Sequence, residues 1–107
     1  GIAEKLIESD EEFKNRVGFI ILLDYFVDKE YYDKMTHLID GFVSDKYYAN
    51  MGLAWLLSVM YVKFPDETYN FLKRAKLSFE VKRLTVRKVR DSYRVSRENK
   101  ERISSIN

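Results

Sequence analysis

Residues 9–15, with the sequence SDEEFKN, return 35 residues later as SDKYYAN at residues 44–50. A long apolar stretch follows the motif in both copies, and at the same offset Ile20 aligns with Trp55. A third, weaker copy begins near Ser78. A period of about 35–40 residues is typical of solenoids built from stacked helix pairs. The sequence therefore predicts the all-α class and an α-α superhelix of about three repeats.

Helical periodicity supports this prediction along the chain. One apolar stripe with steps of four, three and four residues comprises Tyr31, Met35, Leu38 and Phe42. The segment Pro65-Asp66-Glu67 has the composition of a helix start, because proline fits the first turn and acids suit the positive end of the helix dipole. The serine–aspartate pairs at residues 9–10 and 44–45 are expected to cap the helices that follow them. The expected helices span residues 2–8, 10–28, 30–42, 46–63, 65–75, 79–94 and 97–105.

The composition excludes several kinds of site. The 107 residues include no cysteine, four widely separated glycines and one histidine, His37, which falls opposite the apolar stripe and is expected at the surface. Disulfides, thiolate zinc sites, cysteine nucleophiles and glycine-rich phosphate loops are thereby excluded, and we expect neither a metal nor a cofactor. The longest segment without Asp, Glu, Lys or Arg, residues 47–62, has 16 residues, whereas a membrane-spanning helix needs about 20. We therefore expect no membrane segment and a cytoplasmic location.

The organisation of the chain suggests one domain that is part of a longer protein. We expect residues 1–107 to form a single helical-repeat domain. Residues 1–8 have the pattern of the second half of a repeat whose first half would precede Gly1. An apolar face is then expected at the N-terminal end, and it would favour self-association of the fragment, whereas the full-length protein is expected to be monomeric.

Charge is divided unevenly along the chain. Residues 1–50 carry 6 basic and 11 acidic side chains, whereas residues 51–107 carry 13 basic and 6 acidic ones. A basic half suggests a polyanionic partner on one side of the molecule. A well-solvated terminal helix is the alternative interpretation.

Arg16 and Trp55 form the first candidate site. Trp55 aligns with position 20, which lies four residues after Arg16 and therefore on the same side of its helix. If neighbouring helices stack about 8–10 Å apart, a guanidinium and an indole would project from one surface. They could hold a phosphate while the ring packs on a sugar or base. The alternative is that Trp55 is an ordinary core residue and Arg16 is merely solvated.

An arginine stripe forms the second candidate site. Steps of four, three and four residues place four guanidinium groups on one side of a predicted helix, those of Arg83, Arg87, Arg90 and Arg94. Such a stripe suits contact with nucleic-acid backbone phosphates without reading of the base sequence. A solvated helix face is again the alternative. No pair of carboxylates is placed for acid–base catalysis, and Asp91 is expected to pair with a neighbouring arginine.

Two ordered motifs carry a family resemblance. The first is Ser44-Asp45-Lys46-Tyr47-Tyr48-x-Asn50-Met51-x-x-Ala54-Trp55, followed by Asp66-Glu67-Thr68. The second is Val86-x-Lys88-x-x-x-Ser92-Tyr93-Arg94-Val95-Ser96-x-Glu98-x-Lys100. With the repeat length, these motifs resemble the DNA alkylation repair protein family, whose members are HEAT-like-repeat DNA glycosylases acting on alkylated purines. The resemblance covers about residues 9–105, which is nearly the whole chain.

The resemblance implies a concave, basic superhelix that holds duplex DNA. In the family an arginine contacts the DNA backbone and tryptophan rings pack on deoxyribose, while a carboxylate stabilises the cationic sugar formed as the damaged base leaves. Arg16 matches the arginine and Trp55 matches the later tryptophan, so both would belong to the catalytic region.

The chain also departs from the family pattern. The family's catalytic aspartate and an earlier tryptophan would precede Gly1, and an Asn-Lys pair common in the last inner helix appears as Arg83-Leu84. We therefore expect the C-terminal part of a DNA alkylation repair enzyme that contributes duplex-DNA-binding surface and is inactive alone. The alternatives are a catalytically inactive DNA-binding relative and a HEAT-like scaffold that binds a protein partner.

Overall fold

The computed structural model describes residues 1–106, and every regular element in that range is an α-helix. The all-α class is thus confirmed, and residue 107 of the predicted domain lies outside the described residues. The helices are α1 (Ile2–Ile7), α2 (Glu12–Tyr25), α3 (Tyr32–Ile39), α4 (Tyr47–Lys63), α5 (Pro65–Arg74), α6 (Phe79–Arg90) and α7 (Arg97–Ile103). All seven predicted helices are present, in the predicted order.

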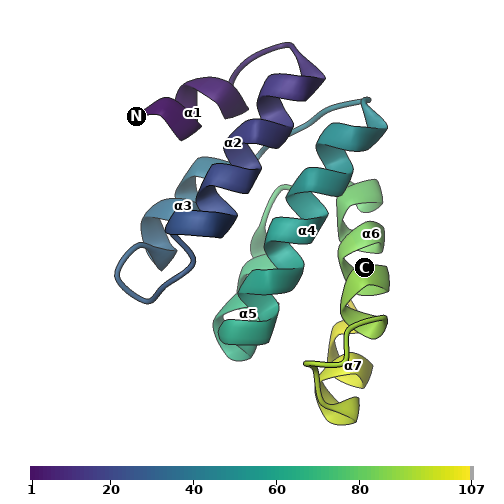
Figure 1. Ribbon diagram of the computed structural model, residues 1–107. Helices are drawn as coiled ribbons and strands as arrows, with labels where there is room; N and C mark the ends of the chain where they lie inside the picture. The colour runs from purple at the N-terminus through teal and green to yellow at the C-terminus, as the bar shows by residue number, and fades with distance from the viewer. Residues whose placement is uncertain (107) are drawn as a thin grey trace.

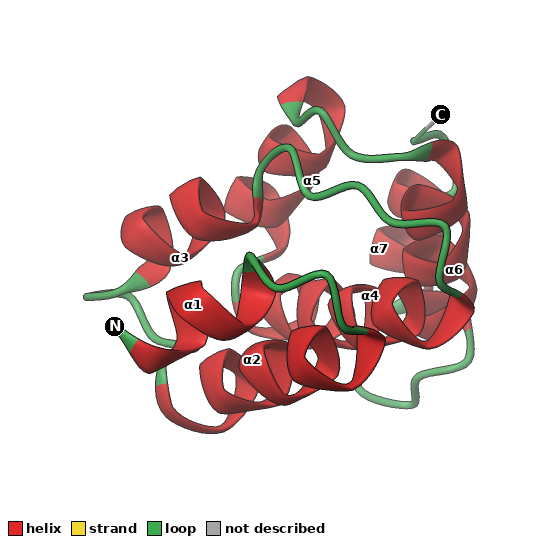
Figure 2. Cartoon of the chain, turned by 90° about the horizontal axis from the view of Figure 1, so that it is seen from above, coloured by secondary structure: helices red, strands yellow, loops and turns green. Residues whose placement is uncertain are grey.

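The helices form two layers. The longer helices α2, α4 and α6 lie side by side and begin at the same end of the molecule (Figure 1). The shorter helices α3 and α5 lie together on one side of this layer (Figure 2). Because α4 packs against α2, α5 and α6, it is apolar nearly all round, and Leu53, Leu57 and Met60 are fully buried.

Several helix ends differ from the predicted ones. The helices that follow the serine–aspartate pairs begin at Glu12 and Tyr47, and in neither does the side chain of the N-cap residue, Glu11 or Lys46, cap the helix. The Ser9 and Ser44 hydroxyls instead accept hydrogen bonds from the backbone N–H groups two residues later, which forms a turn before the helix. Helix α6 ends at Arg90 rather than at residue 94, because the chain turns away over residues 91–96.

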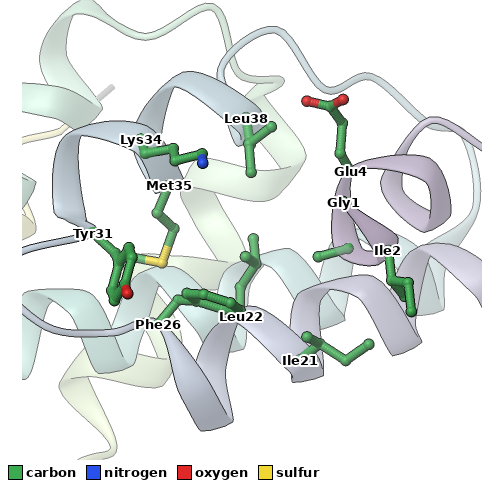
Figure 3. Close-up of a pocket in the computed structure, with 11 residues that line it drawn as sticks. Gly1, Ile2, Glu4, Ile21, Leu22, Phe26, Tyr31, Lys34, Met35 and Leu38 are labelled. Atoms are coloured by element: carbon green, nitrogen blue, oxygen red, sulfur yellow. The ribbon is translucent and has the colours of Figure 1, made fainter.

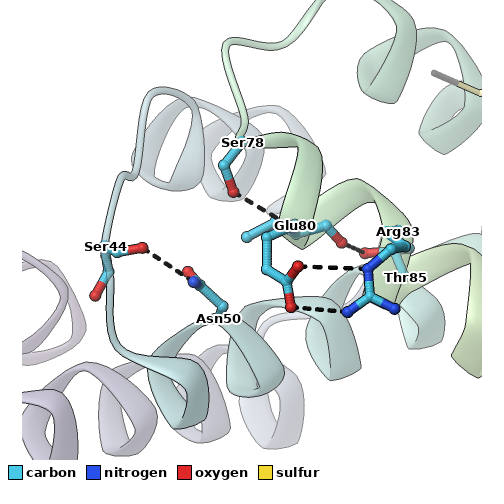
Figure 4. A network of polar contacts seen from close by, with 7 residues as sticks. Ser44, Asn50, Ser78, Glu80, Arg83 and Thr85 are labelled. Atoms are coloured by element: carbon cyan, nitrogen blue, oxygen red, sulfur yellow. Dashed lines mark hydrogen bonds and ion pairs between the residues drawn. The ribbon is translucent and has the colours of Figure 1, made fainter.

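The two copies of the repeated motif share one internal hydrogen bond. The buried Asn15 amide donates through Nδ2 to the Ser9 carbonyl at 2.8 Å, and the buried Asn50 amide donates to the Ser44 carbonyl at 3.0 Å. The Asn50 bond is visible in Figure 4. In both copies a buried asparagine of the long helix therefore ties down the loop that precedes it.

Polar contacts between neighbouring helix pairs recur at a separation of 36 residues. The Glu12 carboxylate accepts from the Tyr48 N–H at 2.8 Å, and the Lys63 ammonium donates to the Val27 carbonyl at 3.0 Å. Further pairs with this separation are Tyr32–Thr68, Asp40–Lys76, Asp66–Arg102 and Tyr69–Ser105. The spatial neighbour of a residue is thus one position beyond its counterpart at the 35-residue offset.

Candidate nucleic-acid interface

The candidate site is centred on Trp55, the only tryptophan in the chain. Residues two positions apart in an α-helix are separated by about 200° around the helix axis. Trp55 therefore points away from the buried side of α4, which carries Leu53 and Leu57. Its side chain is 47% exposed, so the interpretation of Trp55 as an ordinary core residue is wrong. It borders a hollow of about 320 Å³, which we call the Trp55 hollow.

The Trp55 hollow has an apolar base and a largely basic rim. Val59 and Val62 continue the side of α4 on which Trp55 lies. Three cationic side chains line the hollow from three elements: Lys63 at the end of α4, Lys88 in α6 and Arg94 in the loop between α6 and α7.

The geometry of two of these cations is defined by further contacts. The Lys88 Nζ atom lies over the indole, 5.8 Å from the ring centroid, in a cation–π contact. The Lys63 ammonium donates to the Val27 carbonyl oxygen, which holds it where α2 and α4 end. An anion in this hollow would therefore meet cations beside an aromatic ring.

Among the described residues, Asp91 is the one carboxylate on this lining. It was expected to pair with an arginine, but none of the ion pairs among residues 1–106 involves it. Three cations against one carboxylate leave the hollow with a positive balance.

Arg16, on α2, lies beside Gly52, which precedes Trp55 on α4 by three residues, or about one turn. Its guanidinium carbon lies 5.6 Å from the centroid of the Tyr48 ring, and its Cγ atom would lie 3.4 Å from a Cβ built on Gly52. Tyr48 precedes Trp55 by seven residues, or about 10 Å of helix. Arg16 therefore stacks on Tyr48, whereas Trp55 has Lys88 as its cationic neighbour.

The arginine stripe is shorter than predicted, because α6 ends at Arg90 and Arg94 lies in the following loop. Arg83 forms a bidentate ion pair with Glu80 (Figure 4), which raises the pKa of its guanidinium. Arg90 donates to the Ser104 hydroxyl at 2.6 Å. Arg87 is exposed on the same side of α6. The structure thus places Arg94 with Trp55 and leaves three arginines on the outward side of α6.

The hollow could be predicted only in part. Neither Lys88 nor Lys63 is among the site residues predicted from the sequence, although Lys63 follows Trp55 by eight residues on the same helix. The signal that could have found Lys63 is its spacing from Trp55, because residues seven or eight apart share one side of a helix.

A second hollow of about 340 Å³ lies between α1, α2 and α3, at the N-terminal end of the molecule (Figure 3). We call it the N-terminal hollow. Ile2, Phe26, Met35 and Leu38 are among its lining residues, and Glu4 and Lys34 also border it. It corresponds to the apolar face that the sequence predicted at this end.

Neither a metal site nor a membrane span is found in the described part of the chain. Over residues 1–106, no group of three or more His, Asp or Glu side chains is placed to hold a metal ion. Over the same range, none of the helices combines the length and the apolar character required to cross a bilayer. His37 is exposed, as predicted.

The Trp55 hollow can bind but offers little for acid–base catalysis. Its cations can hold a phosphate, and its indole and valines can pack on a sugar ring.

Comparison with known proteins gives no match to a family model, a curated protein or a solved structure.

Proposed function

We propose that this chain is a duplex-DNA-binding part of a DNA alkylation repair enzyme and holds the DNA by its backbone. One observation carries the proposal: a half-exposed indole borders a hollow that three cations surround. The family resemblance of the sequence adds the repair context. Trp55 would pack on a deoxyribose while Lys88 and Arg94 contact the flanking phosphates.

Arg16 has a secondary role in this proposal. Its guanidinium, stacked on Tyr48, would contact a phosphate about 10 Å from Trp55 along α4, which exceeds the spacing of adjacent phosphates on one strand. The outward arginines Arg83, Arg87 and Arg90 would extend the contact if the duplex continued across α6. Base excision would require a carboxylate that this chain does not supply at the position of the family's aspartate, so the chain alone would be inactive. We further propose a cytoplasmic location.

Salt-dependent binding to a duplex oligonucleotide tests the proposal. The logarithm of the affinity should fall linearly with the logarithm of salt concentration, because bound phosphates release counterions. Lys88→Ala and Arg94→Ala should each reduce that slope by about 1. Lys34→Ala is the matched control, because it removes an exposed cation at the N-terminal hollow. Equal effects of Lys34→Ala and Lys88→Ala would show that only net charge matters, and would contradict a defined site.

Trp55 tests the aromatic part of the proposal. Trp55→Ala should weaken duplex binding roughly tenfold while leaving the salt slope unchanged, because stacking contributes about 1–3 kcal/mol without releasing counterions. Since Trp55 is the only tryptophan, its fluorescence should also change on DNA binding. Unchanged emission at saturating DNA would place the contact elsewhere. Absence of duplex binding at low salt would favour the protein-scaffold alternative.

A further inference from the structure

We propose that the Trp55 hollow selects a nucleotide whose sugar carries a free hydroxyl group, and that Asp91 accepts a hydrogen bond from that hydroxyl. Such a hydroxyl belongs either to a ribose, at its 2′ position, or to the last nucleotide of a DNA strand, at its 3′ position. The inference rests on the proposed DNA-binding function and adds the kind of sugar that this site distinguishes.

Asp91 occupies an unfavourable position for a carboxylate. It is the C-terminal cap residue of α6, where the helix dipole is negative and a positive side chain is stabilising. The last turn of α6 follows that preference, since Arg87, Lys88 and Arg90 are all basic. Helix stability therefore does not account for an acid at this position.

The exposed Asp91 carboxylate also takes part in none of the ion pairs among residues 1–106. Its basic neighbours make other contacts, because Lys88 lies over the indole and Arg90 donates to the Ser104 hydroxyl. A carboxylate on the lining of the hollow is thus available to accept a hydrogen bond from a ligand.

Local hydrogen bonds fix the turn that carries Asp91 and Arg94. The Asp91 N–H donates to the Arg87 carbonyl at 3.1 Å, which ties Asp91 to the end of α6. The Ser92 N–H donates to the Val89 carbonyl at 3.1 Å, and the Ser92 hydroxyl accepts from the Arg94 N–H at 3.1 Å. Asp91 and Arg94 therefore line the hollow from one short, locally bonded turn.

The hollow combines the groups that would recognise a nucleotide with a free sugar hydroxyl. Lys88 and Arg94 can contact phosphates, and the Trp55 ring can pack on the sugar between them. An internal deoxyribose has no hydroxyl, so it offers Asp91 no donor while the flanking phosphates repel the carboxylate. A ribose 2′-hydroxyl or a terminal 3′-hydroxyl supplies that donor, and carboxylates bind ribose hydroxyls in the same way in dinucleotide-binding folds.

Competition binding of matched oligonucleotide duplexes tests the proposal. In the first pair, one strand consists either of ribonucleotides or of 2′-fluoro nucleotides, which keep a similar helix form but lack the hydroxyl donor. In the second pair, a nicked DNA duplex ends at the nick in a 3′-hydroxyl or in a 3′-hydrogen. The native chain should prefer the hydroxyl member of at least one pair by about tenfold, because a hydrogen bond to a charged group is a strong one. The pair that responds identifies the source of the hydroxyl.

An alanine variant separates this role from a general effect of charge. Asp91→Ala should abolish the preference, while intact DNA binds as tightly as before or more tightly because a negative charge is removed. Asp33→Ala removes an exposed acid of α3, in the other layer, and is the matched control that should keep the preference.

Two results would overturn the proposal and leave the proposed function standing. One is a native chain that binds the duplexes but prefers neither hydroxyl, and the other is an Asp91→Ala variant that keeps the native ratio of affinities. Absence of binding to every duplex would instead refute the proposed function, and this proposal with it.

Discussion

Gly18 and Gly52 mark two helix contacts that differ in tightness. A Cβ built on Gly18 would lie 2.9 Å from Ile7 Cγ1 and 3.1 Å from the Ala3 carbonyl oxygen, so helix α1 would have to shift. A Cβ on Gly52 would lie 3.4 Å from Phe19 Cδ2, which is an ordinary contact distance. Only the first of these contacts requires the absence of a side chain.

The two alanine substitutions should therefore have opposite effects. Gly18→Ala should lower the free energy of unfolding by about 1–3 kcal/mol, because overpacking exceeds the gain in helix propensity. Gly52→Ala should be neutral or stabilise by up to about 1 kcal/mol, because alanine is the better helix former. Urea unfolding of both variants measures the difference. Equal destabilisation by the two substitutions would contradict the geometry.

At the scale of the element, two equivalent asparagines fix the loops before α2 and α4 with unequal strength. Asn15 donates to three carbonyl oxygens, those of Leu6, Ile7 and Ser9. Asn50 donates only to Ser44, and its buried Oδ1 atom accepts no hydrogen bond from residues 1–106. The repeated motif thus preserves the residue, while the local surroundings set the number of bonds.

Asn15→Ala should destabilise the chain by about 2 kcal/mol, because buried carbonyls lose their donor. Asn50→Ala should change the free energy of unfolding by less than about 1 kcal/mol, since removal of an unsatisfied oxygen offsets the lost bond. Thermal or urea unfolding measures both values. A larger loss of unfolding free energy for Asn50→Ala than for Asn15→Ala would contradict this, because it would mean that the Asn50 Oδ1 atom accepts a stabilising hydrogen bond.

At the scale of the whole molecule, two buried phenols couple the stability of the fold to alkaline pH. The Tyr32 hydroxyl bonds to Thr68 Oγ1 at 2.8 Å, and the Tyr61 hydroxyl donates to the Asn99 carbonyl at 2.6 Å. Burial raises the pKa of both tyrosines above their ordinary value. Both bonds join different helix pairs, so ionisation at either one affects the packing between pairs.

The free energy of unfolding should decrease as the pH rises above about 10. In that range the unfolded chain loses its phenolic protons while the folded chain retains them, so the unfolded state binds fewer protons and gains in relative stability. Tyr61→Phe should reduce this alkaline loss, and Tyr93→Phe, on an exposed loop, is the matched control. Urea unfolding at neutral pH and above pH 10 provides the measurement. An equal slope in all three proteins would exclude Tyr61 as a source of the effect.

The parts of the fold and of the site that depend on local sequence spacing could be predicted, whereas the parts that depend on turns and loop paths could not. Helical periodicity and the repeated motif were enough to place all seven helices, because each depends on local spacing. The ends of α2 and α6 were misplaced, since turns formed by Ser9 and by residues 91–96 compete with helix there. Arg16 lies beside Gly52, one position beyond the Met51 that the 35-residue offset gives, because spatial neighbours are 36 residues apart. Arg94 joins the Trp55 hollow through a loop whose path no periodicity encodes.

Helix α7 is expected to detach from the fold before the other helices do. Helix α7 has seven residues and, like the six-residue α1, is shorter than the about 12–15 that an isolated helix needs; unlike α1, it is held by an ion pair. It depends on the buried Ile103 and on Arg102, which pairs with Asp66 and lies over the Tyr69 ring. High salt should therefore release this end first, and brief trypsin treatment should cut after Arg97 or Lys100. Mass spectrometry of the digest should then show a trimmed core in which helices α1–α6 and Trp55 survive intact.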